Sequence, residues 1–187
     1  MVAWQMAIAP DRCGGAMPAS LACALCLVMA GICATKMAMK MSGYMDQVLA
    51  AARSAGAAGE VPVAAAIVAP DGQLVALAEN RMVRDGSAIH HAEILAIEAA
   101  LASTGKARLD GYDIWVSLEP CTMCAGAIAH ARLRRLYYAA SDEKAGAVES
   151  GVRFFSSSAC HHRPEIYGGI GAASATQMLR DFFAARR

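Results

Sequence analysis

Two short motifs constrain this chain more than any other feature, because together they offer the ligands of a metal site. Residues 120–124 are Pro-Cys-Thr-Met-Cys, and residues 91–93, about 30 positions earlier, are His-Ala-Glu. Proline suits the start of a helix, so Cys121 and Cys124 are predicted to share one face of its first turn. A helix N-terminus favours negative charge and therefore the thiolate, which is the form that binds zinc.

A catalytic zinc ion commonly takes three protein ligands and leaves its fourth position to water. His91, at the start of a second predicted helix, is the candidate for the third ligand, which predicts one Zn²⁺ per subunit. Glu93 can then face the water, whose pKa zinc lowers toward about 7, and act as general acid and base.

Two other interpretations of the cysteines stay open. A redox pair of Cys121 and Cys124 would have no use for the His-Ala-Glu motif. A structural zinc site would need a fourth ligand, which Cys-His-His at residues 160–162 could supply, but Glu93 would then lack a role.

Composition indicates one domain in a reducing compartment. The chain has 187 residues and a net charge of +1, enough for a single domain with its own core. Its seven cysteines are odd in number and irregularly spaced, which argues against a disulfide scaffold. Residues 41–119 carry a net charge of −5 and residues 120–187 one of +4. A basic C-terminal half suggests a polyanionic partner, although an ordinary solvated surface would give the same count.

Residues 1–43 differ from the rest of the chain. No residue from 14 to 35 is charged, and this apolar run is just long enough to span a bilayer or to act as a signal peptide. Its basic residues mostly follow the run. We therefore favour a spurious early start, with the true start at a later methionine such as Met41 or Met45, or a disordered extension, over a membrane segment. The CxxC at 23–26 has no accompanying ligand and is not predicted to bind metal.

Residues 44–187 are predicted to form one domain of alternating strands and helices. Predicted strands cover 61–70, 73–79, 113–118 and 134–140, the first two joined as a hairpin by the turn Pro70-Asp71-Gly72. Predicted helices cover 46–58, 91–104, 121–132 and 175–187. In the second helix, apolar residues at 94, 95, 97, 101 and 102 indicate one buried face. The order of these strands and helices predicts an α/β fold, whose sheet is parallel after an antiparallel hairpin.

The combination H-x-E with P-C-x-x-C is the signature of zinc-dependent nucleobase deaminases, in which the Glu is not a ligand. The sequence resembles one family in particular. The segment at 115–147, WVSLEPCTMCAGAIAHARLRRLYYAASDEKAGA, closely resembles bacterial tRNA-specific adenosine deaminases. Shorter segments agree: GEVPVAAAIV (59–68), HAEILAI (91–97), CHHRPEIYGGI (160–170) and DFFAARR (181–187). The resemblance covers nearly all of 44–187, which we expect to be the zinc deaminase domain, and none of 1–43.

The resemblance implies a cytidine deaminase-like, three-layer α/β/α fold with a five-stranded mixed sheet. It implies a cytoplasmic, homodimeric hydrolase with no membrane partner, which converts adenosine at the wobble position (34) of the tRNA anticodon to inosine. Zinc-activated water would attack C6 of adenine, His91, Cys121 and Cys124 would bind the zinc, and Glu93 would shuttle protons. The expected contacts to substrate or RNA are Asn80, Ala92, Asp142, His162, Arg163, Phe183, Arg186 and Arg187.

Two departures from the family pattern keep an alternative open. Ser87-Ala88-Ile89-His90 stands where the family usually carries Asp-Pro-Thr-Ala, in a loop that borders the pocket, and Ala64 replaces a usual glycine. The altered loop would suit a free-base or nucleoside deaminase, for guanine or cytosine, on the same fold. From another class, a non-catalytic RNA-binding or structural zinc protein would bind zinc without deamination.

Overall fold

The computed structural model describes residues 43–186 of the chain. The predictions made for residues 1–42, among them the apolar extension and the CxxC at 23–26, lie outside these described residues. Within 43–186, no helix combines the length and the apolar composition that crossing a membrane requires.

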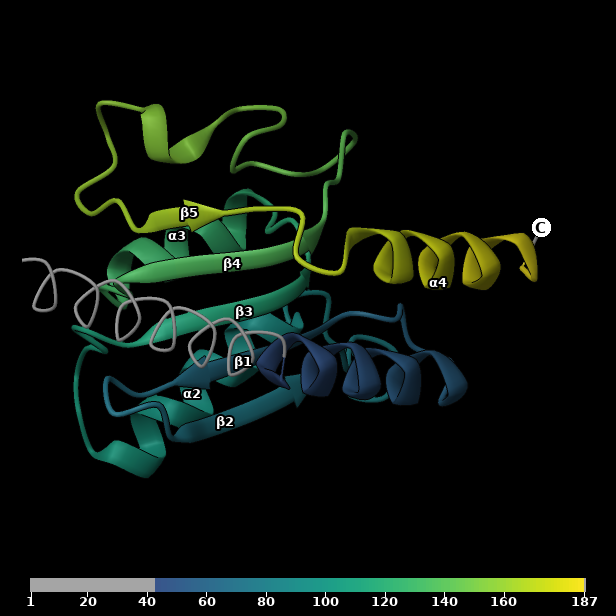
Figure 1. Ribbon diagram of the computed structural model, residues 1–187, viewed down its shortest axis with the longest axis horizontal. Coiled ribbons are helices and arrows are strands. Elements are labelled where there is room, and N and C mark those ends of the chain that lie inside the picture. Colours follow the sequence, from purple (N-terminus) through teal and green to yellow (C-terminus); the bar gives the residue numbers. More distant parts are fainter. Residues whose placement is uncertain (1–42, 187) are drawn as a thin grey trace, which may run out of the picture. The chain divides into compact units, whose positions relative to one another are not determined.

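A five-stranded mixed sheet forms the centre of this region (Figure 1). The strands are β1 (Ala64–Val68), β2 (Leu74–Glu79), β3 (Asp113–Leu118), β4 (Arg135–Ala140) and β5 (Glu165–Tyr167). They lie in the order β2-β1-β3-β4-β5. β1 pairs antiparallel with both β2 and β3, whereas β3, β4 and β5 are parallel. The predicted hairpin and the predicted mixed sheet are therefore confirmed.

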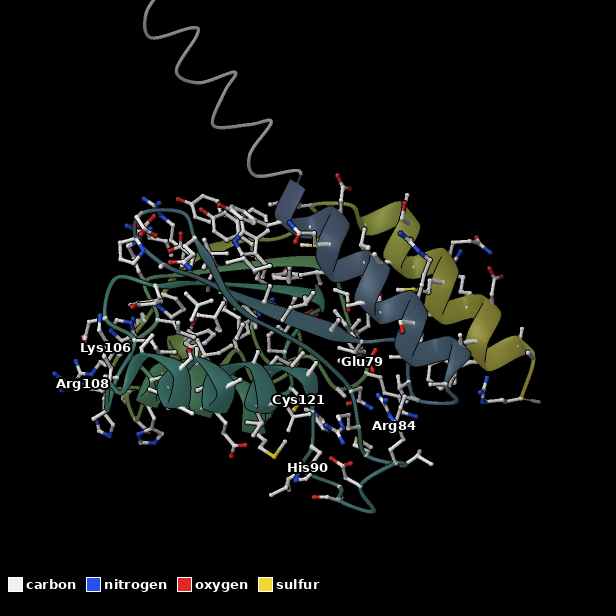
Figure 2. All side chains as sticks on the ribbon, turned by 90° about the horizontal axis from the view of Figure 1, so that it is seen from below. Glu79, Arg84, His90, Lys106, Arg108 and Cys121 are labelled. Atoms are coloured by element: carbon white, nitrogen blue, oxygen red, sulfur yellow. The ribbon has the colours of Figure 1, made fainter. Side chains whose placement is uncertain are left out.

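Helices cover both faces of the sheet and give the predicted three layers (Figures 1 and 2). They are α2 (Ala92–Thr104), α3 (Thr122–His130), α4 (Ala172–Ala184) and a helical segment at residues 43–57, with a short 3-10 helix at Phe154–Ser156. Successive side chains of a strand point to opposite faces. Accordingly, Ala65 and Ile67 of β1 join the core with α2 and α3, whereas Ala66 and Val68 join the core with residues 43–57 and α4.

The buried face of α2 differs from the predicted one. The helix buries mainly alanines, at positions 92, 96 and 100, together with Ile97, whereas Ile94 and Leu95 are only half-buried and Ala102 is exposed. Nine of the 13 residues of α2 are apolar, so the sequence period could not select a face. The alanine side of the helix faces the sheet, because small side chains let the helix approach the sheet closely.

One helix boundary and one strand also differ from the predictions. Pro120 does not open α3, because the segment before the helix is still extended: the Pro120 carbonyl accepts a hydrogen bond from the N–H of Ala147 at 2.9 Å, and α3 begins at Thr122. β5 was not predicted from its residues, although the resemblance implied a fifth strand. Its three residues are too few to display a two-residue alternation.

Candidate metal centre

The candidate site lies where the N-termini of α2 and α3 meet, beyond the C-terminal end of β3. His91 is the N-cap residue of α2 and Cys121 that of α3, and both have extended backbones, with ψ of 150° and 174°. An N-cap side chain commonly accepts a hydrogen bond from its own helix, but neither of these side chains does so. The imidazole and the thiol are therefore available to bind a metal ion.

Cys124 completes the cluster from the first turn of α3. Nδ1 of His91 lies 3.7 Å from Sγ of Cys121 and 3.5 Å from Sγ of Cys124. Ligand atoms of the three residues all lie within 4.8 Å of one another. One imidazole and two thiols at this spacing match the protein ligands of a zinc ion that keeps its fourth position open. The three predicted zinc ligands thus form one cluster.

Hydrogen bonding within the cluster shifts the pKa of each ligand group. A hydrogen bond between the thiols lowers the pKa of Cys121 and raises the pKa of Cys124. A hydrogen bond to Cys121 raises the pKa of His91. Zinc binds thiolate and neutral imidazole, so metal binding at this cluster releases protons.

Glu93 lies in the first turn of α2, beside the cluster. Its side chain is buried, with 4% of the residue exposed, and it contacts Cys124. Burial raises the pKa of Glu93 above its ordinary value. A raised pKa lies closer to neutral pH, at which a general acid and base must both take up and release a proton. Ala92, between Glu93 and His91, is fully buried at the first position of the helix.

Glu119 anchors the loop of residues 142–150 next to the cluster. Its buried carboxylate accepts five hydrogen bonds, from the backbone N–H groups of Asp142, Val148, Glu149 and Ser150 and from the hydroxyl of Ser150, at 2.8 to 3.1 Å. Burial raises the pKa of Glu119, but these bonds outweigh it and hold the pKa below its ordinary value. The loop in turn pairs with the metal centre, because Gly146 forms a β-bridge with Cys121.

Asp142, a predicted RNA contact, belongs to the same loop. Its carboxylate accepts hydrogen bonds from the backbone N–H groups of Lys144 and Ala145, both at 3.0 Å, and so fixes the turn. The contact to RNA stays a prediction.

Asn80 lies on the other side of the site, at the start of the loop of residues 80–90 that joins β2 to α2. It is buried, and its amide Nδ2 donates a hydrogen bond to Glu60 at 3.4 Å. The two ends of the loop are tied together next to His91, since the N–H of Arg81 donates to the carbonyl of His90 at 3.1 Å.

The remaining predicted RNA contacts fall in two places. Phe183 and Arg186 lie at the end of α4, where the guanidinium of Arg186 stacks 3.6 Å from the ring centre of Phe182. Arg187 lies outside the described residues. His162 and Arg163 precede β5, so they lie at the start of the parallel strands, whereas Cys121 follows the end of β3. The His162 imidazole lies 2.6 Å from the Leu133 carbonyl. Their contacts to RNA also stay predictions.

Figure 2 shows which labelled side chains lie at each end of the strands. Glu79, Arg84, His90 and Cys121 gather at one end of the strands, and Lys106 and Arg108 lie at the other. Two ion pairs join the starts of the parallel strands at that other end. They are Arg134 with Asp113 and Arg135 with Glu165, both at 2.8 Å. Two of the nine basic residues of the C-terminal half, Arg134 and Arg135, are therefore paired, and these two lie away from the metal centre.

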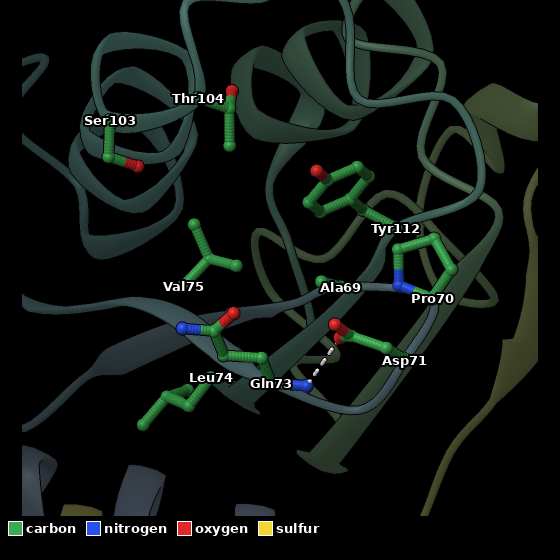
Figure 3. Close-up of a pocket in the computed structure, with 9 residues that line it drawn as sticks. All are labelled: Ala69, Pro70, Asp71, Gln73, Leu74, Val75, Ser103, Thr104 and Tyr112. Atoms are coloured by element: carbon green, nitrogen blue, oxygen red, sulfur yellow. Dashed lines mark hydrogen bonds between the residues drawn. The ribbon is translucent and has the colours of Figure 1, made fainter.

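A hollow of about 450 Å³ is also remote from the cluster (Figure 3). It is bordered by the turn between β1 and β2, by the end of α2 and by Tyr112. In the turn, the carboxylate of Asp71 accepts a hydrogen bond from the N–H of Gln73 at 2.9 Å. Val68, just before this turn, pairs with Asp113 at the start of β3, whereas Cys121 follows the end of that strand. The hollow is therefore not part of the metal site.

Two buried carboxylates beside the site were missed in the sequence. Glu60 and Glu119 are 0% and 3% exposed, and each holds a loop that borders the cluster. Their positions could have indicated this role, since each acid lies next to a buried apolar strand in the sequence. A charged side chain in such a place must be paired, because an isolated buried charge is very costly.

Comparison with known proteins agrees with this geometry. The family profile described as the zinc-binding region of cytidine and deoxycytidylate deaminases matches residues 37–140. A tRNA-specific adenosine deaminase of Agrobacterium fabrum is 49% identical over 144 residues, which cover 77% of this chain and 94% of that protein.

Solved structures give the same result for the fold. One, from a study of A-to-I editing by tRNA A34 deaminases at the wobble position, matches with a TM-score of 0.72 and 49% identity over 73% of this chain and 99% of the other. A guanine deaminase from Nitrosomonas europaea matches with a TM-score of 0.62 and 29% identity, over 76% of this chain and 84% of that protein.

Proposed function

Since the chain belongs to the tRNA-specific adenosine deaminases of the cytidine and deoxycytidylate deaminase family, we propose that it hydrolyses adenosine to inosine at the wobble position of a tRNA anticodon. The observation that carries the proposal is the cluster of His91, Cys121 and Cys124 with the buried Glu93 beside it. The much higher identity to a tRNA deaminase than to a guanine deaminase, 49% against 29%, favours a tRNA substrate over a free base.

His91, Cys121 and Cys124 hold the zinc ion in this proposal, and their donor set fits it. Zinc, when bound, supplies a Lewis acid that lowers the pKa of water enough to make a nucleophile at neutral pH. The ligands sit at the starts of two helices packed on one sheet, so the backbone fixes them before any substrate arrives.

Glu93 moves the protons. Its carboxylate takes a proton from the attacking water and delivers it to the adenine ring at N1 while the new bond to C6 forms. The proton of the hydroxyl now bonded to C6 then passes through Glu93 to the exocyclic amine, the C6–N bond breaks, and ammonia leaves as the C6 carbonyl of inosine forms. Burial suits this role, because it raises the pKa of the carboxyl group and keeps bulk water from competing for the proton.

The substrate side of the site is formed by the two anchored loops. We assign Asn80 and the backbone at Ala92 to the flipped nucleoside and Asp142 to a neighbouring nucleotide. At the end of α4, Phe183 is 48% exposed, and the aromatic ring with the nearby Arg186 offers the stacking and charge that single-stranded RNA needs. Arg187 would extend this charge.

A homodimer in the cytoplasm completes the proposal. Ile89 lies two residues before His91 and Met123 directly before Cys124, and they are 58% and 38% exposed. Exposed apolar side chains so close to a reaction centre are the kind of surface that a second copy of the chain would cover. A tRNA substrate supports a cytoplasmic location for the enzyme. Light scattering on the purified chain should give twice the mass of one subunit.

The test of the function uses the purified full chain and an anticodon stem-loop RNA with adenosine at the wobble position. Nucleoside mass spectrometry should detect inosine with the wild type and none with Glu93→Ala. Free adenosine, guanine and cytosine are assayed in parallel. Turnover of a free base without inosine in the RNA would overturn the tRNA assignment in favour of a free-base deaminase, and zinc binding without any turnover would indicate a non-catalytic zinc protein.

A further inference from the structure

We propose that Glu60 is a positioning residue, which fixes the Asn80 side chain and the loop of residues 80–90 in the geometry that deamination requires. The inference rests on the proposed function, because it treats Asn80 as a contact to the substrate. Glu60 lies outside the metal cluster and outside both motifs that carry the chemistry. Its role follows from what surrounds its carboxylate.

The carboxylate of Glu60 is fully buried and faces only hydrogen-bond donors. Oε1 accepts a hydrogen bond from the N–H of Arg84 at 2.7 Å, and Oε2 accepts one from the N–H of Val83 at 3.1 Å and one from Nδ2 of Asn80 at 3.4 Å. The Nε atom of Arg84 lies 3.8 Å from Oε1. Charge-assisted bonds of this kind are stronger than neutral ones, and they compensate for burying the charge.

This arrangement sets the orientation of the Asn80 amide. A carboxylate can only accept hydrogen bonds, so Asn80 must turn its NH₂ group toward Glu60 and its carbonyl oxygen away from it. The backbone of the same residue is also held, since its N–H donates to the carbonyl of Val63 at 2.9 Å. Asn80 is therefore oriented before substrate binds.

The same contacts reach the metal centre through the loop. The carboxylate holds the loop backbone at Val83 and Arg84, and Arg84 also pairs with Glu79 at 2.6 Å. At its far end the loop is closed by the hydrogen bond from Arg81 to the carbonyl of His90, the residue before the ligand His91. Asn80 thus belongs to a closed loop that Glu60 anchors from the interior and that ends directly before His91.

The decisive variant is Glu60→Gln, which keeps the size of the side chain but turns an NH₂ group toward a set of donors. We expect hydrogen exchange to accelerate in residues 80–90 but not in residues 142–150, and zinc to remain at about one ion per chain. We expect kcat/KM for the stem-loop RNA to fall about 10-fold to 100-fold, since hydrogen bonds to a charged group are lost. Glu119→Gln is the matched control, and it should accelerate exchange in 142–150 instead.

A double-mutant cycle then separates positioning from general stability. If Glu60 acts through Asn80, Glu60→Gln should reduce kcat/KM strongly in the wild type but little in Asn80→Ala. Glu119→Gln shares no hydrogen-bond partner with Asn80, so its effect should be the same in both backgrounds. Additive effects for Glu60→Gln would overturn the proposal, as would unchanged exchange in residues 80–90.

A second variant keeps the test decisive if Glu60→Gln does not fold. Glu60→Asp retains the charge but shortens the side chain by one methylene, and it goes through the same cycle and the same exchange measurement. Failure of the proposed function is distinguishable, because it would appear as no inosine in the stem-loop with the wild-type chain. Exchange in residues 80–90 reports on Glu60 whichever substrate the enzyme uses.

Discussion

The Nδ1 atom of His91 lies 3.5 Å from the Sγ atom of Cys124, although 33 positions separate the two residues in the chain. Each residue sits at the start of a different helix, and both helices pack on the same face of the sheet. The distance is therefore set by the packing of secondary structure and not by a local turn. Substitutions of the ligands should consequently affect metal binding and chemistry before they affect the fold.

Replacing one ligand should remove the metal. We expect Cys121→Ser to lose most of its zinc and its deaminase activity, because a serine hydroxyl stays protonated where a thiolate is needed. Zinc per chain is measured by mass spectrometry of metals after gel filtration. Cys160→Ser is the control, since that thiol lies outside the cluster and donates to the His162 carbonyl at 3.0 Å. A zinc-free Cys160→Ser protein would contradict the assignment.

Replacing the proton shuttle should spare the metal. Glu93→Gln is expected to keep its zinc and to lose activity by about 100-fold to 10,000-fold, since an amide cannot take up and release the proton. Inosine formation and zinc content are measured on the same preparation. Glu98→Gln, at an exposed position of the same helix, should match the wild type in both. An active Glu93→Gln protein would mean that another group carries the proton.

The loop beside the metal should depend on one glycine. A Cβ atom at Gly146 would lie 2.6 Å from the carboxyl carbon of Glu119 and closer still to the Asp142 carbonyl oxygen. We expect Gly146→Ala to destabilise the protein by roughly 1–3 kcal/mol in urea unfolding. Gly126→Ala should change the free energy of unfolding in the opposite direction. Gly126 lies inside α3, and no atom lies within 4 Å of the position that its Cβ would take. That substitution should stabilise by about 0.5–1 kcal/mol.

The end of α4 should contribute charge to RNA binding. Arg186→Ala is expected to weaken binding of the stem-loop and to reduce the slope of log affinity against log salt concentration by about one unit. Fluorescence anisotropy over a range of salt measures both quantities. Thermal unfolding is recorded as well, because Arg186 also stacks on Phe182. Arg108→Ala, at the opposite edge, serves as control, and an equal change in slope there would contradict the assignment.

The sequence was most informative where a local pattern and a chemical requirement coincided. His91, Cys121 and Cys124 could be selected as one zinc site because ligand chemistry demands them together, and the structure confirms their cluster. The hairpin was predictable because Pro70-Asp71-Gly72 allows little besides a turn.

Other features depend on tertiary contacts that no local pattern contains. The buried face of α2 was mispredicted because nine of its 13 residues are apolar, and the space above the sheet determines which of them are buried. The roles of Glu60 and Glu119 are set by backbone N–H groups that lie 23 to 31 positions further along the chain. The positions of His162 and Arg163 at the far edge follow from the parallel pairing of β4 and β5.

The way in which Glu60 and Glu119 hold their loops has a consequence for how such enzymes diversify. Both carboxylates bind mainly main-chain N–H groups, which every amino acid except proline possesses. Side chains along the two loops can therefore be exchanged during descent without loosening the backbone that carries them. Residues 87–90, Ser-Ala-Ile-His, lie in one of these loops, so their side chains can differ while the backbone keeps its anchor at Glu60.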